Sequence, residues 1–255
     1  MHQEWTGEGL IFKVGRFREI DCWVRFFSPS LGLVTAMAFG GSRSRRRFCG
    51  CLDALNRVLF KVRFFPAKGY HVLEEATLLH VFSRLRQEPV RSGLAANCLH
   101  FVQALRISSE EAAEIHDLLM ETLEVLDQAE EITPVFLQLF RAKICFAHGY
   151  VPELTTCAGC GRPVTEPRPG ECLGLCLALD QGRVRCSRCV SQDGPQFRIG
   201  PETRAILEGL STSRPRQWPS LPMTAKTRGE LFQVVDGYVR HHLGLRWKNG
   251  RFVGD

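Results

Sequence analysis

Two closely spaced pairs of cysteines constrain this chain more than any other feature. Residues 157–160 read Cys-Ala-Gly-Cys and residues 186–189 read Cys-Ser-Arg-Cys, with 25 residues between the two turns. Two such turns can supply the four sulfur ligands of a tetrahedral Zn²⁺ ion. A closed shell of this kind has no open position for water, so it predicts stability and not catalysis. We predict a structural zinc site formed by Cys157, Cys160, Cys186 and Cys189.

The remaining cysteines do not suggest a disulfide framework, because the total of 11 is odd. Cys172 and Cys176 lie between the two turns, and either one could replace a predicted ligand; otherwise both are buried thiols. A redox-active pair is the alternative to a metal site. The sequence shows no apolar leader and no run of about 18 apolar residues. We therefore expect a cytoplasmic protein without a membrane span, in which disulfides are rare.

Charge is distributed unevenly along the 255 residues. Residues 1–80 carry a net charge of +5, residues 81–152 carry −4, and residues 153–255 carry +5. Basic segments are candidates for binding nucleic-acid phosphates, whereas an acidic helical segment usually is not. A solvated protein surface would give the same numbers, so the charge pattern needs support from a local motif.

Short apolar runs in the first 80 residues predict β-strands. They lie at 10–14, 20–27, 31–39, 58–65 and 69–77. In the fourth run, Lys61 and Arg63 alternate with apolar residues, which is the period of a strand buried on one face. Five short strands fit a small barrel such as the OB-fold, although an SH3-like barrel or a meander fits equally well.

The loop after the third run concentrates positive charge. Residues 40–48 read Gly-Gly-Ser-Arg-Ser-Arg-Arg-Arg-Phe, so four arginines fall within five residues. Arginine forks bind phosphates, and a neighbouring aromatic ring can stack on a base. We predict that this loop binds nucleic acid and that the patch continues along the fourth strand; a solubilising loop is the alternative. The predicted residues are Arg43, Arg45, Arg46, Arg47, Lys61 and Arg63.

From about residue 80, apolar residues recur at helical spacing. The pattern predicts helices over 91–105, from 108 onward, after Pro134, over 201–210 and over 224–243. Ser108 and Glu111 have the spacing of a capping box, and Gly149 and Gly244 are expected to end the helices that precede them. The fold class is therefore α+β and multidomain. We expect a β-domain at 1–80, a helical domain at 81–152 and 199–255, and the zinc module embedded in it at 153–198.

Several short motifs, in this order and spacing, resemble the RecO family of bacterial recombination mediators. The first is Gly-Glu-Gly-Leu-Ile at 7–11, and the basic loop at 40–48 is the second. Gly-Tyr-Val-Pro-Glu-Leu at 149–154 leads into the first cysteine pair, and Tyr-Val-Arg-His-His-Leu-Gly lies at 238–244. The resemblance covers nearly the whole chain. The Cys49-Gly50-Cys51 sequence departs from the family pattern.

The resemblance implies an N-terminal OB-fold and a helical domain with an embedded zinc module. It also implies that the protein binds single- and double-stranded DNA and anneals complementary strands. With RecR, it would help to load the recombinase onto strands coated by single-stranded-DNA-binding protein, in the cytoplasm at the nucleoid. The acidic, phenylalanine-ended tail of that coating protein needs an apolar pocket with cations, for which we predict Phe140, Arg141 and Lys143.

The sequence does not indicate an enzyme or a small-molecule substrate. It contains no Lys-x-Asp-Gly ligase motif, no Gly-x-x-x-x-Gly-Lys phosphate loop and no His-Glu-x-x-His pair. We therefore predict a DNA repair and recombination protein without catalytic residues. The alternatives are a zinc-containing nucleic-acid-binding regulatory module that does not anneal strands, and an interaction scaffold whose DNA contact is incidental.

Overall fold

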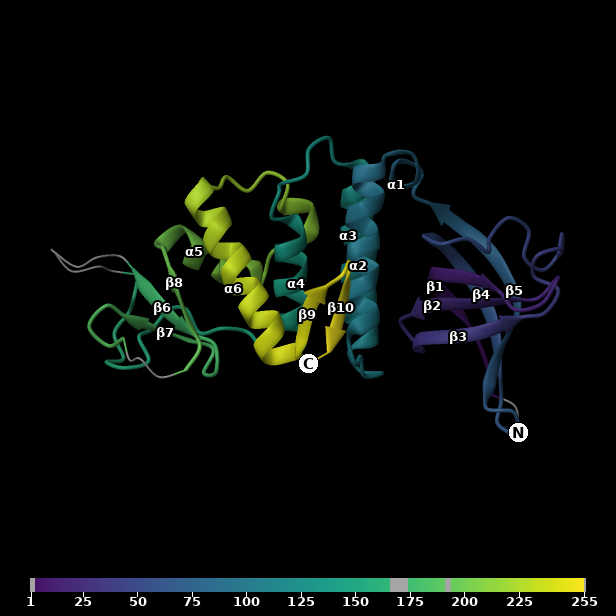
Figure 1. The fold of residues 1–255 in the computed structure, drawn as a ribbon, viewed down its shortest axis with the longest axis horizontal. Coiled ribbons are helices and arrows are strands. Elements are labelled where there is room, and N and C mark those ends of the chain that lie inside the picture. Colours follow the sequence, from purple (N-terminus) through teal and green to yellow (C-terminus); the bar gives the residue numbers. More distant parts are fainter. Residues whose placement is uncertain (1–2, 166–173, 191–193, 255) are drawn as a thin grey trace. The chain divides into compact units, whose positions relative to one another are not determined.

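The computed structural model describes residues 3–165, 174–190 and 194–254, and it shows a mixed α+β fold, as predicted (Figure 1). The chain forms two compact units. The first contains the residues up to 99 together with 106–128, and the second contains 100–105 and the residues from 129 onward. Helix α2 (Pro89–Ala104) contributes to both units.

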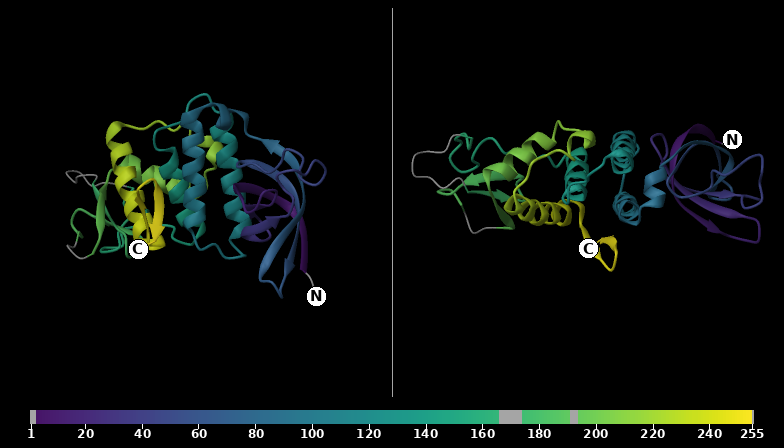
Figure 2. Two further views of the ribbon diagram at one scale, coloured as in Figure 1. Left: turned by 45° about the vertical axis from the view of Figure 1, so that its right-hand side comes forward. Right: turned by 90° about the horizontal axis from the view of Figure 1, so that it is seen from above.

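Five strands at the N-terminus form a closed barrel in the order β1-β2-β3-β5-β4, curving around a common centre in both views of Figure 2. β1 pairs antiparallel with both β2 and β4, and a short parallel pairing of β3 with β5 completes the closure. The strands are β1 (Gln3–Arg16), β2 (Cys22–Ser28), β3 (Gly32–Ala38), β4 (Asn56–Phe65) and β5 (Tyr70–Val81).

The barrel core follows from the period of two in its strands. In β4, Phe60 and Val62 are buried, whereas Lys61 and Arg63 lie on the outer face, so the predicted alternation is confirmed. The rings of Phe26 and Phe60 meet inside the barrel with their centroids 4.6 Å apart. Burial of these apolar faces supplies the main stabilising free energy of the unit.

β1 begins earlier than the apolar run at 10–14 predicts. Its first half alternates polar residues with Trp5, Gly7 and Gly9, and this half pairs with β4 from Gln3 onward. Gly9 is required by close packing, since a Cβ there would lie 3.0 Å from the carbonyl oxygen of Phe27. A search for apolar runs overlooks such a segment because its strand character comes from cross-strand pairing.

The segment between β3 and β4 covers one end of the barrel. Phe48 and Cys51 are buried in the barrel core, and the Cys51 thiol donates to the carbonyl of Ala76 at 3.2 Å. Burial raises the pKa of the Cys51 thiol. The carbonyl of Arg47 also accepts a hydrogen bond from the backbone amide of Ala76 in β5, at 2.9 Å. The segment that carries the predicted basic loop is therefore anchored to β5 through both backbone groups of Ala76.

Two further helices belong to the first unit, α1 (Ser83–Gln87) and α3 (Ala112–Gln128). The predicted capping box before α3 is present. The amide of Ser108 donates to the Glu111 carboxylate at 3.0 Å, and the amide of Glu111 donates to the Ser108 hydroxyl at 3.3 Å.

The second unit is built on helices α4, α5 and α6 and two small sheets. Gly149 (φ 87°) ends α4 and Gly244 (φ 62°) ends α6, both as predicted. Of the described helices, none is both long and apolar enough to cross a membrane. The elements are α4 (Phe136–Ala147), β6 (Leu175–Ala178), β7 (Arg183–Cys186), β8 (Gln196–Ile199), α5 (Pro201–Leu210), a 3₁₀ turn (Pro215–Gln217), α6 (Ala225–Leu243), β9 (Leu245–Lys248) and β10 (Arg251–Gly254).

A glycine in α6 allows the three-stranded sheet β7-β6-β8 to pack against this helix. A Cβ on Gly237 would lie 2.3 Å from the ring of Phe197 in β8 and 3.2 Å from Leu179. A side chain larger than hydrogen at this position would have to displace the Phe197 ring and the end of the Leu179 side chain. Gly237 therefore sets how closely the sheet that carries Cys186 approaches the helices of the second unit.

We expect Gly237→Ala to lower the free energy of unfolding of the second unit by about 1–3 kcal/mol, because overpacking displaces the side chains of Phe197 and Leu179 that pack against the helix. Denaturant unfolding of the full chain measures this change. Gly229→Ala in the same helix is the matched control, since nothing lies within 4 Å of a Cβ there. The control should be stabilised by up to about 1 kcal/mol because alanine favours the helix. Equal effects of the two substitutions would contradict the packing argument.

Candidate metal centre and nucleic-acid interface

The two cysteine turns converge in the second unit. The Sγ atoms of Cys157, Cys160, Cys186 and Cys189 all lie within 4.8 Å of one another. Gly159 makes this approach possible, because a Cβ at that position would lie 2.6 Å from the Cβ of Cys189. The sequence places a glycine at the point where the two turns meet, and the resulting cluster can hold a metal ion.

Backbone amides donate to the sulfur of Cys157, the buried member of this cluster, and so favour the thiolate that binds a cation. Burial alone would raise the pKa of the Cys157 thiol, but the amides of Cys186, Cys160 and Gly159 donate to its sulfur and lower the pKa to about 6. These amides therefore favour the thiolate form of Cys157. Hydrogen bonding to Cys186 raises the pKa of the Cys189 thiol to about 12. A divalent cation among the four sulfurs would reverse this effect by favouring thiolates.

The structure also bears on the two cysteines that lie between the turns in sequence. Cys176 is buried in β6 and is not part of the four-cysteine cluster, and Cys172 lies outside the described residues. The set of sulfurs that the structure brings together is the set predicted from the Cys-x-x-Cys spacing. All four donors come from the protein, so a tetrahedral ion here has no position left for water.

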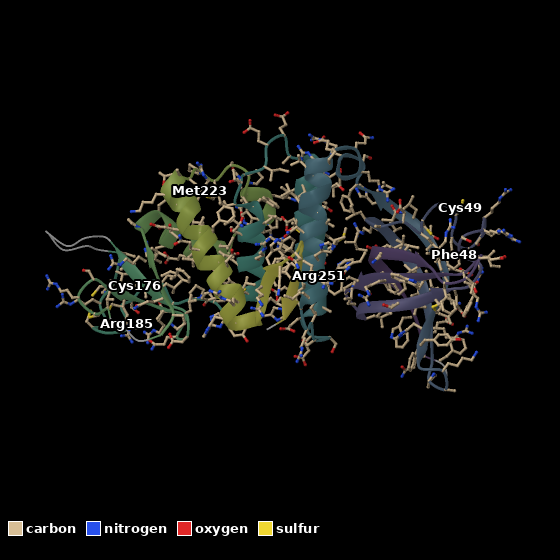
Figure 3. The ribbon with its side chains drawn as sticks, in the orientation of Figure 1. Phe48, Cys49, Cys176, Arg185, Met223 and Arg251 are labelled. Carbon is tan, nitrogen blue, oxygen red and sulfur yellow. The ribbon has the colours of Figure 1, made fainter. Side chains whose placement is uncertain are left out.

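The predicted basic loop is exposed, and Figure 3 labels Phe48 and Cys49 at its end. Arg43, Arg45 and Arg46 present their guanidinium groups to solvent around an open cavity of about 800 Å³. Arg47 has a different role. Its guanidinium donates to the carbonyl of Phe39 and lies 5.0 Å from the centre of the Phe48 ring, so it fixes the loop. Arg47 therefore anchors the loop that carries the other three arginines.

Lys61 and Arg63 lie on the outer face of β4 in a network of ion pairs. Lys61 Nζ lies 3.1 Å from Glu4, and the Arg63 guanidinium lies 2.9 Å from Glu4 and 3.1 Å from Glu74. Hydrogen bonds from Arg63 and Lys61 lower the pKa of the Glu4 carboxyl, and Glu4 in turn raises the pKa of Lys61. Both cations are half-buried and already paired with carboxylates, whereas Arg43, Arg45 and Arg46 of the loop are exposed.

The three residues predicted for a partner tail make contacts within the second unit. Phe140 is only 1% exposed. Arg141 is buried with its guanidinium 4.8 Å from the centre of the Phe252 ring and 3.5 Å from the Asp236 carboxylate. Lys143 Nζ donates to the carbonyl of Leu210 at 2.9 Å. A peptide would reach Phe140 only after the surrounding helices move, and the pocket stays a prediction.

Comparison with models of known protein families shows to which family the chain belongs. The model of the recombination protein O N terminal matches residues 1–82, and that of the recombination protein O C terminal matches residues 86–251. The chain belongs to the recombination protein O (RecO) family.

Individual RecO proteins are similar over their full lengths. The chain is 42% identical to the DNA repair protein RecO of Solidesulfovibrio magneticus, over 98% of this chain and 99% of that protein. It is 40% identical to the DNA repair protein RecO of Oleidesulfovibrio alaskensis, over 98% of both chains. The match to DNA repair proteins confirms the family resemblance carried by the short motifs.

The structure of this RecO chain also reveals basic residues that the sequence analysis did not single out. The register of β7-β6-β8 places Arg185 and Arg198 directly on either side of Cys176, in one row of the sheet. Arg183 lies on the same face, two residues along β7. In the sequence, only the alternation Arg-Val-Arg at 183–185 indicates a strand with basic residues on one face, and three residues are too few to predict one.

Proposed function

We propose that the chain is a non-enzymatic recombination mediator that binds single- and double-stranded DNA and anneals complementary strands. The observation that carries the proposal is the exposed, anchored group of Arg43, Arg45 and Arg46 in a member of a DNA repair family. Guanidinium groups on an exposed loop contact backbone phosphates without reading bases. Binding of this kind is independent of sequence and falls steeply as salt increases.

Annealing follows from charge neutralisation. Two single strands repel each other through their phosphates, and a protein that holds both on basic surfaces lowers this repulsion. The loop of the first unit offers one such surface. The row of Arg185 and Arg198 in the second unit offers another of the same sign. No reacting group is required, because base pairing itself supplies the free energy.

The metal in this proposal is a structural Zn²⁺ ion held by the four clustered cysteines. Four thiolates in tetrahedral arrangement are the donor set that zinc accepts, and the buried position of Cys157 suits a site that stabilises the fold. When bound, the ion joins the first cysteine turn to β7 and the turn after it. The residues of the cluster contribute no open ligand position, which supports a role outside catalysis.

The proposal includes an assignment of the parts of the chain. The β-domain at 1–80 is an OB-fold, supported by five strands in the order β1-β2-β3-β5-β4, and this fold commonly binds oligonucleotides. The helical domain spans 81–152 and 199–255, with the zinc module at 153–198. We propose that the protein acts in the cytoplasm at the nucleoid. The ten cysteines that the structure describes are free thiols, which is typical of proteins in a reducing compartment.

Two protein partners complete the proposed role. RecR would act with this chain in loading recombinase, and single-stranded-DNA-binding protein would be engaged through its acidic C-terminal tail. Lys143 is the most accessible of the three residues predicted for that tail, and its ammonium group is within 2.9 Å of the carbonyl oxygen of Leu210. The support for both partners is membership in the family.

We expect the protein to accelerate pairing of two complementary strands that are each coated by single-stranded-DNA-binding protein. Pairing is measured by fluorescence quenching between end-labelled strands, with non-complementary strands as the control. A zinc-containing regulatory module that only binds DNA would not change the rate. DNA binding without faster pairing would therefore favour that alternative.

A further inference from the structure

Exposed aromatic side chains lie at the same end of the barrel as the basic loop. Phe17, in the turn between β1 and β2, is 55% exposed, and Phe39, directly after β3, is 38% exposed. Each ring therefore offers a flat apolar face to the solvent on which a second flat group can stack. Neither ring belongs to the barrel core.

Hydrogen bonds hold the two backbone segments that carry these rings together. Ser42 donates its amide to the carbonyl of Ile20 at 3.1 Å, and the amide of Gly40 donates to the Asp21 carboxylate at 2.8 Å. The turn itself is closed by the amide of Phe17, which donates to the carbonyl of Asp21 at 2.9 Å. The β1–β2 turn and the start of the basic loop therefore form one continuous, ordered surface.

Positive charge surrounds this aromatic surface. The guanidinium of Arg18 lies 5.4 Å from the centre of the Phe17 ring, and Arg16 is exposed at the end of β1. Arg43, Arg45 and Arg46 project from the adjoining loop. The one exposed carboxylate of the turn is Glu19. Cations therefore outnumber anions around the two rings.

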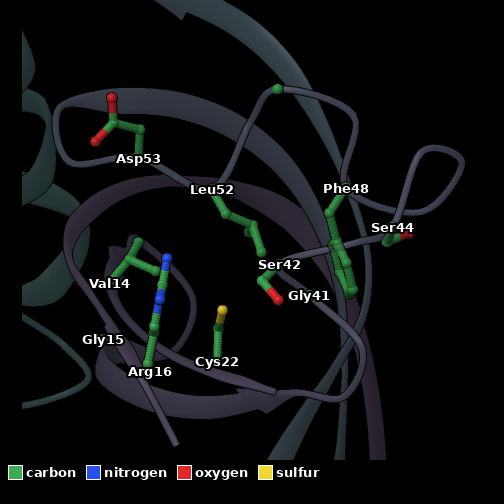
Figure 4. Close-up of a pocket in the computed structure, with 11 residues that line it drawn as sticks. Val14, Gly15, Arg16, Cys22, Gly41, Ser42, Ser44, Phe48, Leu52 and Asp53 are labelled. Carbon is green, nitrogen blue, oxygen red and sulfur yellow. The ribbon is translucent and has the colours of Figure 1, made fainter. Parts of the chain in front are cut away.

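A cavity of about 510 Å³ adjoins the same surface, and it lies in the size range of small-ligand sites (Figure 4). Figure 4 shows Arg16, Ser42 and Leu52 directed toward a common space above the Cys22 thiol. The lining combines an apolar side with hydroxyl groups and one cation. Asp53, also in the lining, is neutralised by Arg86 at 3.0 Å.

We propose that this end of the barrel is a base-stacking site for single-stranded DNA. Unpaired bases stack on Phe17 and Phe39, the arginines hold the phosphates on either side, and the cavity accommodates a base turned out of the strand. The inference rests on the proposed DNA binding and adds a preference for unpaired strands. Paired bases are stacked inside a duplex and cannot cover these rings, whereas every unpaired base offers a flat face.

The double variant Phe17→Ala/Phe39→Ala tests the site. We expect it to bind a single-stranded oligothymidylate about tenfold or more weakly, because stacking contributes substantially per base. Its affinity for a duplex of equal length and its salt dependence should match the wild type, since no cation is removed. Phe17→Tyr/Phe39→Tyr keeps the rings and should bind both DNAs normally. Thermal unfolding verifies that each variant is folded.

Phe232→Ala is the matched control, because Phe232 is 40% exposed on α6 and lies in the second unit. It should leave single-strand binding unchanged. An unchanged ratio of single-strand to duplex affinity in the double variant would overturn the stacking site. The proposed function would still hold in that case if DNA binding remained salt-dependent and still required the arginines of the loop. Loss of binding to an acidic, phenylalanine-ended peptide, with single-strand binding retained, would assign the surface to a protein partner instead and overturn the proposal.

Discussion

Replacing Cys157 by serine should abolish metal binding by the four-cysteine cluster and unfold the proposed zinc module. Cys157 is the buried thiol of the cluster, and three backbone amides donate to its sulfur. Serine is a poor ligand for Zn²⁺ and would leave a site with three sulfurs. Structural zinc contributes about 10–16 kcal/mol in small zinc-finger peptides. Since whole domains have a stability of about 5–15 kcal/mol, the module is not expected to remain folded without the ion.

Metal analysis of the purified protein and thermal unfolding measure this effect. Wild type should contain about one zinc ion per chain, the number that four thiolates can coordinate tetrahedrally, and Cys157→Ser should contain almost none. Cys49→Ser is the control, because Cys49 is exposed in the loop of the first unit and lies outside the cluster. Cys176→Ser should also retain the metal. Full zinc retention in Cys157→Ser would show that the ligand set is wrong.

The triple variant Arg43→Ala/Arg45→Ala/Arg46→Ala should lose most of the salt-dependent binding to single-stranded DNA. Each phosphate contact on a single strand contributes about 0.7 to the slope of log affinity against log salt, so three lost contacts should reduce the slope by about 2. Arg47 is left in place because it fixes the loop through the carbonyl of Phe39. The loop is expected to keep its fold while its outward charges are removed.

Fluorescence anisotropy over a range of salt concentrations measures this slope. Lys61→Ala/Arg63→Ala is the matched control, because it removes two cations that are already paired with Glu4 and Glu74. Its effect on the slope should be much smaller than that of the triple variant. If the triple variant keeps the wild-type slope and affinity, the loop does not bind DNA; a larger effect of the control would place the phosphates on β4.

The local pattern of the sequence predicted much of this fold. The alternation along β4, the capping box at Ser108 and the glycines that end α4 and α6 all appear as predicted, because each depends on residues close in sequence. The β9–β10 hairpin was missed although Asn249-Gly250 carries the signal. Both residues have positive φ, at 51° and 76°, as a two-residue hairpin turn requires.

What the sequence could not predict depends on contacts between distant residues. Lys61 and Arg63 have the composition of a DNA-binding strand, but their partner Glu4 lies in β1 and reaches them only after the barrel closes. Phe140 has the chemistry of a partner pocket, yet it is buried against Phe101 with ring centroids 6.2 Å apart. The cluster of four cysteines was predictable because zinc chemistry requires a particular local spacing.

The closure of the barrel has a consequence for how the chain folds. β1 must pair with β4, so that Gln3 meets Phe64, and the last gap closes only when β5 has paired with both β3 and β4. Pairings between residues so far apart form slowly, because loop closure costs entropy before any contact is made. Until β5 arrives, β3 and β4 are open edges that can pair with another chain. Closure of the barrel is therefore expected to be the slow step in folding of this protein. It is also the step at which the chain is most exposed to aggregation.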